Sequence, residues 1–551
     1  MRRSPETDRE AATAAGAVTS RRPGPAAVAW VVLAAAVCVA AFSTRFPPLY
    51  DYYQWLFQGH VTSSLLFGDA ADFHGQYTLS PVPVPNLAAP LVIAVLNTVL
   101  PIELAGRVFL ALTACGFAGG YGFLVRSVQR RPTAVEFLGF VWALGFFAYK
   151  GYLSFLFGLG LAFVLVAVLH RATAGANALT GRRLAAVCAL GALVYLAHLV
   201  AWTVCAVGVA VYAVVCWRRG RRRTAGALVA TLLPAVAAGL WYLLAEHGGA
   251  GITLYPAAAD KAISLAETLQ PFLRLDPFPP SFPIFWLNVL VVVVLAVLVV
   301  AGVDRTRLRV ALRHRPVLWL AAALALLALV LPISMVNELI KPDERYVLPA
   351  LLLAAAALPY RRTSPRALPR ALPAAAVALG IGVIGLHTVE YVAVGHRIAA
   401  QDHAVDAAIP PGQPMLSLSI ASRYGCAPAS GPSVGVPTLK WFGVDEPMEH
   451  GRARVNVDET SLVHSASTAP PSVQVLTPTT AEVPATVAPL AGQYPFVLVV
   501  ACPSDLDAAA RDLAPVYQPV SAGEGFLLLR NDQEPADTSD RLHPGSATRQ
   551  K

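Results

Sequence analysis

Long apolar runs separated by short polar segments fill the chain from about residue 26 to residue 394. A helix of roughly 20 apolar residues is long enough to cross the hydrocarbon core of a bilayer. The pattern therefore predicts about eleven transmembrane helices. They are residues 26–44, 104–125, 133–149, 152–170, 184–198, 200–217, 225–245, 283–303, 317–334, 346–359 and 370–394.

Arginine clusters between these runs predict the topology. Short loops rich in Arg and Lys remain in the cytoplasm, and the N-terminus of this chain is itself basic. Counting crossings from there places every strongly basic loop on the same inner side. These loops are 126–131, 171–183, 218–223, 305–315 and 361–370. An odd number of crossings then places the C-terminal region on the outer face of the plasma (inner) membrane.

This count depends on two segments. Residues 86–100 are apolar but short and lie between proline-rich flanks, so we expect a re-entrant or interfacial segment that does not cross. Residues 184–217 have basic residues at both ends, so they must form a helical hairpin. If either expectation failed alone, every later loop would change sides.

The composition changes near Gly395, where Pro, Ser and Thr become frequent. Short β-type runs at 414–420, 496–501 and 526–530 and a helix at 505–513 predict a small α/β domain. The expected fold is thus an all-α polytopic membrane bundle, residues 26–394, followed by an extracytoplasmic α/β domain, residues 395–531. The polar segments 1–25 and 532–551 are predicted to be disordered.

Bulk composition agrees with a membrane protein. The 551 residues are 56% hydrophobic and only 14% charged, and the mean hydropathy is +0.57. Soluble domains carry about a quarter charged residues. The net charge of +9 lies mainly in loops between apolar runs, so nucleic-acid binding is not predicted. Cys426 and Cys502 lie in the C-terminal region, where a disulfide and two free thiols remain equally open.

The segment after the first run, within the first outer loop 45–103, carries the main candidate for chemistry. Asp51 lies there among aromatic residues, at the end of a span. Partial burial of a carboxylate raises its pKa and suits it to act as a general base. Tyr52, Tyr53 and Trp55 could stack on a sugar ring or form an interfacial aromatic belt, and the sequence leaves both open.

Several segments resemble a known family. The loop around Asp51, the segment 85–107, the segment 151–160 and the stretch 195–199 resemble the bacterial integral membrane glycosyltransferases of the C-type fold, through related uncharacterised multispan proteins. Members of that family take a sugar from a polyprenyl-phosphate carrier. The resemblance covers roughly residues 26–395 as architecture. It implies a C-type enzyme that transfers a hexosyl or pentosyl group at the outer face.

The resemblance implies that Asp51 is the catalytic base. The sequence departs from many members in having a single acid there rather than an acidic pair, so a divalent cation remains open and no residue is assigned to a metal. The expected partners are a lipid-linked sugar donor and membrane lipids. Polar residues at the outer ends of the helices are candidates to bind substrate or its phosphate. They are His60, Lys150, His198, Glu338, Lys341 and Arg345.

Each of these candidates also has a structural interpretation. The charged residues 338–345 could form a solvated loop with weak surface ion pairs, Lys150 could extend towards headgroups, and His198 could pack between helices. Asp69, Asp72 and His74 lie close together, and loop solvation explains them better than a metal site.

Two other functions compete with sugar transfer. One is a transporter or flippase of a lipid-linked or small polar substrate. The other is a non-catalytic scaffold that presents the C-terminal domain. A transporter is expected to show internal repeats, and the sequence shows none. Phosphate-binding loops and dinucleotide fingerprints are also absent from the sequence, which argues against an ATP-driven pump.

Overall fold

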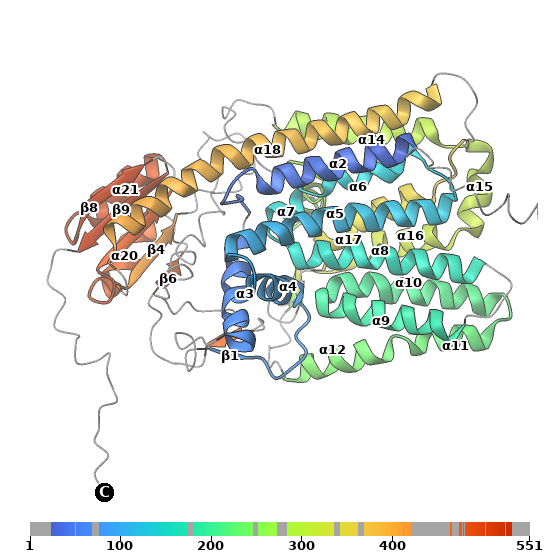
Figure 1. Cartoon of the computed structure of the whole chain (residues 1–551), viewed down its shortest axis with the longest axis horizontal. Coiled ribbons are helices and arrows are strands. Elements are labelled where there is room, and N and C mark those ends of the chain that lie inside the picture. The colour runs from blue at the N-terminus through green and yellow to red at the C-terminus, as the bar shows by residue number, and fades with distance from the viewer. Residues whose placement is uncertain are drawn as a thin grey trace, which may run out of the picture.

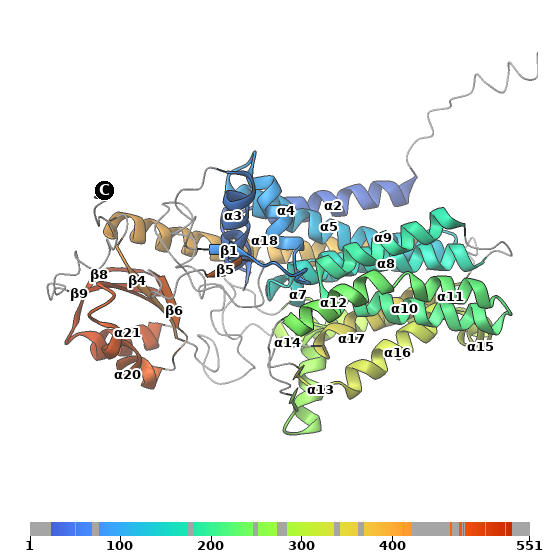
Figure 2. The same ribbon diagram turned by 90° about the horizontal axis from the view of Figure 1, so that it is seen from below.

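The computed structural model describes most of the chain outside its termini and a few long loops. The described residues are 24–49, 51–68, 77–174, 180–245, 252–272, 284–335, 342–361, 368–410, 413–420, 463–465, 473–476, 478, 480–501, 503–523 and 525–531. They form a helical bundle and a smaller α/β domain beyond one end of it (Figures 1 and 2).

Seven helical segments among the described residues are long and apolar enough to span a membrane. They are α2 (Pro25–Phe42), α5 (Ile102–Gln129), α8 (Leu153–Ala174), α10 (Leu199–Arg218), the pair α11 (Arg222–Ala230) and α12 (Leu233–Ala245), α14 (Ile284–Gly302) and α18 (Leu368–Ala408). Their outward surface is apolar, with Val31, Phe285 and Trp286 more than 60% exposed. Such a surface is stable only against lipid, so the chain is a multi-pass membrane protein.

The remaining predicted spans are shorter helices. Residues 134–149 form η1 (Ala134–Phe137), α6 (Leu138–Trp142) and α7 (Phe146–Tyr149). The others are α9 (Gly181–Ala197), α16 (Pro316–Val330) and α17 (Glu344–Ala357). Helix α16 is bent by 76° from α15 (Arg305–His314), and counting this pair as one span raises the total to eight. The prediction of about eleven full spans is therefore not confirmed, because the short helices fall below the length of a straight crossing.

Local structure is as expected for the two segments on which the topology depends. Helix α4 (Ala88–Asn97) has ten residues and a length of about 15 Å, half of a hydrocarbon core. Helices α9 and α10 form the expected hairpin, joined by the single extended residue His198. Helix α3 (Tyr52–Phe67) lies across the end of the bundle beside α4 (Figure 1). A Cβ on Gly59 of α3 would lie 2.5 Å from Ile93 of α4, which shows how closely the two helices approach.

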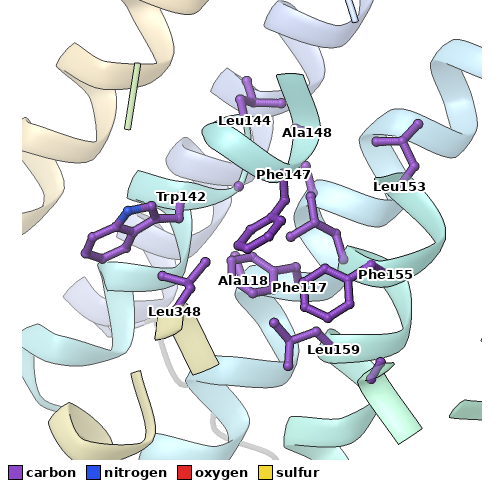
Figure 3. Close-up of a cluster of buried hydrophobic side chains, with 14 of the residues drawn as sticks. Phe117, Ala118, Trp142, Leu144, Phe147, Ala148, Leu153, Phe155, Leu159 and Leu348 are labelled. Carbon is purple, nitrogen blue, oxygen red and sulfur yellow. The ribbon is translucent and has the colours of Figure 1, made fainter. Parts of the chain in front are cut away.

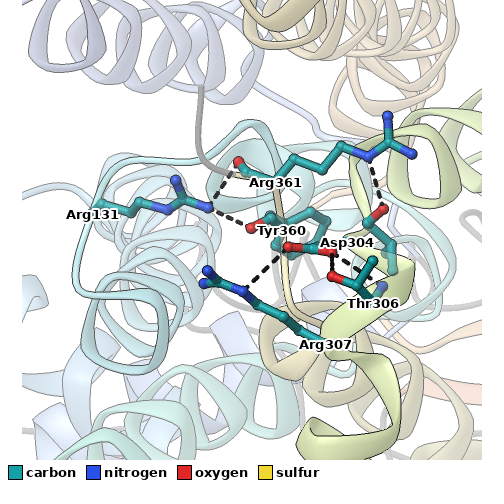
Figure 4. A network of polar contacts seen from close by, with 7 residues as sticks. Arg131, Asp304, Thr306, Arg307, Tyr360 and Arg361 are labelled. Carbon is teal, nitrogen blue, oxygen red and sulfur yellow. Dashed lines mark hydrogen bonds and ion pairs between the residues drawn. The ribbon is translucent and has the colours of Figure 1, made fainter. Parts of the chain in front are cut away.

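The described parts of the predicted basic loops lie at the other end of the bundle, around α11 and α15, which we call the arginine end (Figure 1). There Arg131 donates hydrogen bonds to the carbonyls of Tyr360 and Arg361, and Arg361 donates to Val303 (Figure 4). Arg315 binds the carbonyl of Ala357 at 2.6 Å, at the C-terminus of α17. Cations at a helix C-terminus are favoured by the partial negative charge of its last carbonyls. Which side of the membrane this end faces stays a prediction.

Aromatic side chains fill the centre of the bundle. Figure 3 shows Phe117 of α5, Phe147 of α7 and Phe155 of α8 packed around one another, with centroids of Phe147 and Phe155 5.0 Å apart. Close backbone contact between α5 and α8 supports this cluster. A Cβ on Gly120 would lie only 2.2 Å from the carbonyl oxygen of Gly160. Small residues let membrane helices approach in this way and gain dispersion energy.

The C-terminal region contains the predicted α/β domain. Its five-stranded sheet has the order β6-β4-β7-β9-β8. The strands are β4 (Met415–Ser419), β6 (Val473–Leu476), β7 (Phe496–Val500), β8 (Tyr517–Gly523) and β9 (Phe526–Asn531). Strands β4, β6 and β7 are parallel, whereas β9 is antiparallel to β7 and β8. One face packs against α21 (Pro503–Leu513) and α20 (Val483–Val487), next to the turns η3 (Thr480–Glu482) and η4 (Ala488–Leu490).

Helix α18 continues past residue 394, the predicted boundary, to Ala408, and its end joins the core on the other face of the sheet. A Cβ on Gly395 would clash with Thr44, so α18 passes in direct contact with the chain after α2. Buried Ile398, Val405 and Asp402 follow along the same helix. The composition changes near Gly395, whereas the helix itself continues to Ala408.

Two short strand pairs connect loops at the end of the bundle where α3 lies. Strand β1 (Tyr77–Leu79), in the first loop, is antiparallel to β5 (Val463–Ser465) from the C-terminal region. Strand β2 (Ile252–Thr253) pairs with β3 (Ser334–Met335), and α13 (Ala258–Glu267) follows β2. These pairs join segments far apart in the sequence at one end of the bundle, which we call the α3 end.

We predict that Gly120→Ala destabilises the bundle, because the added methyl overlaps the Gly160 carbonyl oxygen. Overpacking of this kind costs about 1–3 kcal/mol. The matched control is Gly119→Ala, whose Cβ meets nothing within 4 Å. Thermal unfolding in detergent is expected to show a lower midpoint for Gly120→Ala only. Equal midpoints for the two variants would contradict the close α5–α8 contact.

Candidate functional site

Asp51 immediately precedes α3 at the α3 end of the bundle, where it is half-buried. The turn that links α7 to α8 packs directly against it. Gly151 in this turn has φ of +75°, and a Cβ on it would lie 2.4 Å from the Asp51 backbone nitrogen and 2.8 Å from the Asp51 Cβ. The Trp55 indole donates a 2.7 Å hydrogen bond to the Gly151 carbonyl. Two segments predicted to form separate outer loops are thus joined in one site.

The three aromatic residues after Asp51 are structural in this arrangement. Tyr52 and Tyr53 are essentially fully buried, and Trp55 is only 8% exposed. The Tyr52 and Tyr53 rings contact each other edge to face, with centroids 5.4 Å apart. None of them offers an open ring face, so their predicted role in stacking on a sugar is not supported. Their burial instead anchors α3, because buried aromatic rings contribute large apolar areas.

Arg345 and His198 lie next to the same turn. The Arg345 guanidinium lies over the Tyr152 ring, 4.4 Å from its centroid, and 6.0 Å from that of Phe155. The His198 ring contacts Phe155 with centroids 5.3 Å apart. Since Tyr152 follows Gly151 in sequence, Asp51, Arg345 and His198 are connected through one short segment of the chain.

His198 is held as a neutral hydrogen-bond donor. Its Nδ1 accepts a hydrogen bond from the backbone N–H of Val200 at 3.1 Å, which caps α10. Burial, together with the charge of Arg345, holds the pKa of His198 well below its usual value. A neutral imidazole whose Nδ1 accepts a hydrogen bond carries its proton on Nε2. His198 can therefore donate a hydrogen bond, and it does not add positive charge to the site.

Lys150 brings a second positive charge to the turn. Its ammonium group lies 5.7 Å from the Phe146 ring centroid. The charge of Lys150 also affects Glu267, the last residue of α13. Burial raises the pKa of Glu267, the charge of Lys150 lowers it, and the charge of Glu344 raises it. Lys150 and Glu344 therefore both lie near Glu267. No sequence signal selects Glu267, because it is the last residue of an ordinary amphipathic helix.

A buried polar network fixes the start of α17, which carries Arg345. Asp343 is fully buried, and its Oδ2 accepts a 2.7 Å hydrogen bond from the Tyr255 hydroxyl. The oxygen of the same hydroxyl lies 2.9 Å from Ser264 Oγ, whose hydroxyl can donate to it. Asp343 is thus not part of a solvated loop, as one interpretation of the sequence had it. Its partner Tyr255 lies 88 positions earlier in the chain, just before α13.

His60 does not join the site. It lies nine residues after Asp51 on α3, about 13 Å along the helix axis. Its Nδ1 lies 3.1 Å from the side-chain nitrogen of Asn97, the last residue of α4. Burial lowers the pKa of His60, and the charge of Glu103 partly opposes this. The contact therefore joins α3 to α4, away from Asp51.

The remaining candidates lie outside the described residues. These are Glu338 and Lys341, the metal candidates Asp69, Asp72 and His74, and the cysteines Cys426 and Cys502. Within the described ranges, no group of three or more His, Cys, Asp or Glu side chains could hold a metal ion.

The fold matches that of known membrane proteins. No protein-family model and no curated protein sequence matches the chain. Two crystal structures of ArnT from Cupriavidus metallidurans superpose on 92% of it with a TM-score of 0.51. The chain has the ArnT fold. One of these structures is bound to undecaprenyl phosphate and is 15% identical, with 99% of its chain covered; the other is in the apo state and is 16% identical, with 98% covered.

The ArnT likeness confirms the C-type fold expected from the sequence. It extends over the helical bundle and the α/β domain, because almost the whole of both chains is aligned. At this level of identity the likeness concerns the fold alone. The roles of individual residues must be argued from the contacts of this chain.

We predict that Gly151→Ala displaces Asp51 and destabilises the α3 end. The new methyl would overlap Asp51, and a residue with a Cβ is also strained at positive φ by roughly 1–2 kcal/mol. Gly220→Ala is the matched control, since Gly220 has φ of +77° but nothing within 4 Å of its Cβ position. In thermal unfolding, Gly151→Ala is expected to lose clearly more stability than the control. Equal losses would mean that strain alone acts and that the contact with Asp51 is unimportant.

Proposed function

We propose that this protein is a membrane glycosyltransferase that moves a hexose or pentose from a polyprenyl-phosphate carrier to an acceptor hydroxyl. The observation that carries the proposal is the convergence of Asp51, Lys150 and Arg345 on one turn, within a fold shared with ArnT. ArnT has been solved with a lipid phosphate bound, undecaprenyl phosphate. A donor of the same chemical class would bring a phosphate, whose negative charge needs cations. The acceptor hydroxyl would need a base to take its proton.

In the proposed reaction Asp51 acts as the general base. Its carboxylate takes the proton of the acceptor hydroxyl while the acceptor oxygen attacks the anomeric carbon of the sugar. The bond between that carbon and the phosphate oxygen breaks, and the electron pair leaves with the polyprenyl phosphate. Half-burial at the end of the bundle suits the base, because a partly desolvated carboxylate binds a proton more strongly.

Arg345 and Lys150 supply the positive charge for the leaving phosphate. A guanidinium can bind two phosphate oxygens at once, and the contact with Tyr152 orients its plane. The buried network of Asp343 and Tyr255 holds the start of α17, so Arg345 is placed on a rigid element. Positioned charges of this kind stabilise a transition state without reorganisation during the reaction. His198 would add a hydrogen bond from its Nε2.

Glu267 and Glu344 give the site a mixed charge. Glu267 lies near both Lys150 and Glu344, and burial raises the pKa of Glu267. In the proposed enzyme Glu267 keeps Lys150 in place before the donor binds, and both carboxylates accept hydrogen bonds from sugar hydroxyls. Carboxylates suit this role because each one can accept several hydrogen bonds.

The proposed location of the site is the outer face of a bacterial plasma membrane. The arginine end would face the cytoplasm according to the positive-inside rule. The α3 end and the C-terminal α/β domain, which lies beyond it in Figure 1, would then face outwards. A polyprenyl chain would lie in the bilayer, with its phosphate at the level of α3.

We predict that Asp51→Asn lowers sugar transfer by about 10²–10⁴-fold while expression and stability remain normal. The amide keeps the shape of the side chain but cannot accept the proton. The assay measures undecaprenyl phosphate released from undecaprenyl-phosphate-linked hexose and pentose donors in proteoliposomes, with membranes of the native host as acceptor. The control is Asp507→Asn, an exposed carboxylate on α21 in the C-terminal domain.

The outcome separates the enzyme from its alternatives. Loss of release in Asp51→Asn but not in Asp507→Asn supports catalysis. Release that is unchanged in both variants would contradict the role of Asp51. If the wild-type protein moves the intact donor across the bilayer without releasing undecaprenyl phosphate, the protein is a flippase and the proposal fails.

A further inference from the structure

The arginine end of the bundle contains a cavity of about 600 Å³. It lies between the start of α2, the end of α5 with the turn that follows, and the end of α8, far from the α3 end (Figure 1). Its lining residues are Ala26, Ala27, Arg126, Ser127, Arg130, Arg131, Pro132 and Arg171. Half of them are arginines and none is acidic.

Two of these arginines are bound to the protein itself. Arg126 forms two 3.0 Å hydrogen bonds with the carboxylate of Glu136, which is fully buried. Arg131 donates to the carbonyls of Tyr360 and Arg361 at 2.6 and 2.9 Å, as Figure 4 shows. These contacts fix the walls of the cavity. They also occupy Glu136, the carboxylate that contacts the lining.

Arg130 and Arg171 are different. Among the described residues, neither side chain has an ion pair or a hydrogen bond to the protein. The Arg171 guanidinium lies over the Phe123 ring, 4.5 Å from its centroid, which holds its plane without neutralising its charge. Arg130 ends α5 in the left-handed conformation, with φ of 58°. The cavity therefore carries a net positive charge on two exposed guanidinium groups, and Phe123 orients that of Arg171.

The positive-inside rule explains why arginines occur at this end, but not why four of them line one cavity. Other arginines at the same end bind backbone carbonyls, as Arg315 does at Ala357 and Arg361 does at Val303. Arg130 and Arg171 have no such acceptors among the described residues. Guanidinium groups with open donors around a cavity match the oxygens of a phosphate group.

The surroundings of the cavity fit a ligand that also touches lipid. Val28, Val31 and Val32 of α2 are 49%, 68% and 44% exposed, directly after the lining residues Ala26 and Ala27. This stripe would face the acyl chains of the bilayer. Basic cavities between helices at the cytoplasmic surface are suited to bind anionic headgroups.

We propose that this cavity is a second anion site, in which Arg130 and Arg171 bind the phosphate group of an anionic ligand. It lies at the end of the bundle opposite Asp51, and it does not depend on the proposed sugar transfer. The phosphate could belong to the headgroup of an anionic phospholipid or to a free phosphate ion. The chemistry is shared, and the test separates the two sources.

The test uses the purified full-length chain in detergent and native mass spectrometry to count bound ligand. Dioctanoyl phosphatidylglycerol is the anionic probe, dioctanoyl phosphatidylcholine is the zwitterionic comparison, and inorganic phosphate is the competitor. We expect Arg130→Gln/Arg171→Gln to weaken phosphatidylglycerol binding by on the order of tenfold or more, because two charge-assisted contacts are lost. The matched control is Arg309→Gln/Arg313→Gln, which removes the same charge from the exposed face of α15 at the same end.

The outcomes are distinct. Loss of phosphatidylglycerol binding in the cavity variant but not in the control supports the site. If inorganic phosphate displaces the lipid at comparable concentration, the ligand of the site is free phosphate rather than a lipid headgroup. Equal binding by the wild type and the cavity variant would overturn the proposal. Equal loss in the control would overturn it as well, because net charge alone would then explain binding. Single substitutions of Arg130 and Arg171 repeat the comparison if the double variant fails to fold.

Discussion

The arrangement of the α3 end depends on one close contact, between Gly151 and Asp51. Gly151 lacks a Cβ and adopts positive φ, so the turn between α7 and α8 can lie directly against the backbone before α3. The hydrogen bond from Trp55 to the Gly151 carbonyl closes the same contact. The Arg345 guanidinium lies over the ring of Tyr152, the next residue in the turn. A larger residue at position 151 would move the Asp51 carboxylate away from Lys150 and Arg345.

Charge is divided between the two ends of the bundle. At the arginine end, arginine side chains bind the carbonyls at helix C-termini and in the adjacent loops, which stabilises the bundle. Arg130 and Arg171 instead line a cavity. The α3 end combines Asp51, Glu267, Glu344, Lys150 and Arg345, so acids and bases meet there in a partly buried setting. Such mixed, desolvated groups suit chemistry on a polar substrate, whereas one-sided positive charge suits binding of an anion.

Much of the framework followed from sequence alone. Apolar length and arginine clusters predicted the helices and the gathering of basic loops at one end, because both depend on simple transfer energies. The alternating strands after residue 413 predicted the α/β domain. The short helices α16 and α17 were harder to judge, since apolar composition does not reveal where a helix bends, as α15 and α16 do by 76°. The end of α18 was missed because its polar residues read as a domain boundary.

The site was predictable only in part. Asp51, Lys150, His198 and Arg345 could be selected as polar residues at helix ends, but their grouping depends on contacts between segments far apart in the chain. Burial of Tyr52, Tyr53 and Asp343 is likewise a product of tertiary packing, which no local pattern encodes. Glu267 carried no sequence signal. Residue type therefore identified candidates, and packing decided which of them meet.

The most direct test of the account is a structure of the full chain in a lipid nanodisc with undecaprenyl phosphate added. If the donor site lies around Asp51, the phosphate is expected at the α3 end, within contact distance of Arg345 or Lys150 and beside Asp51. A phosphate bound only in the cavity of Arg130 and Arg171, or elsewhere on the bundle, would contradict it. In that case the cluster around Gly151 would be a structural junction and not the donor site.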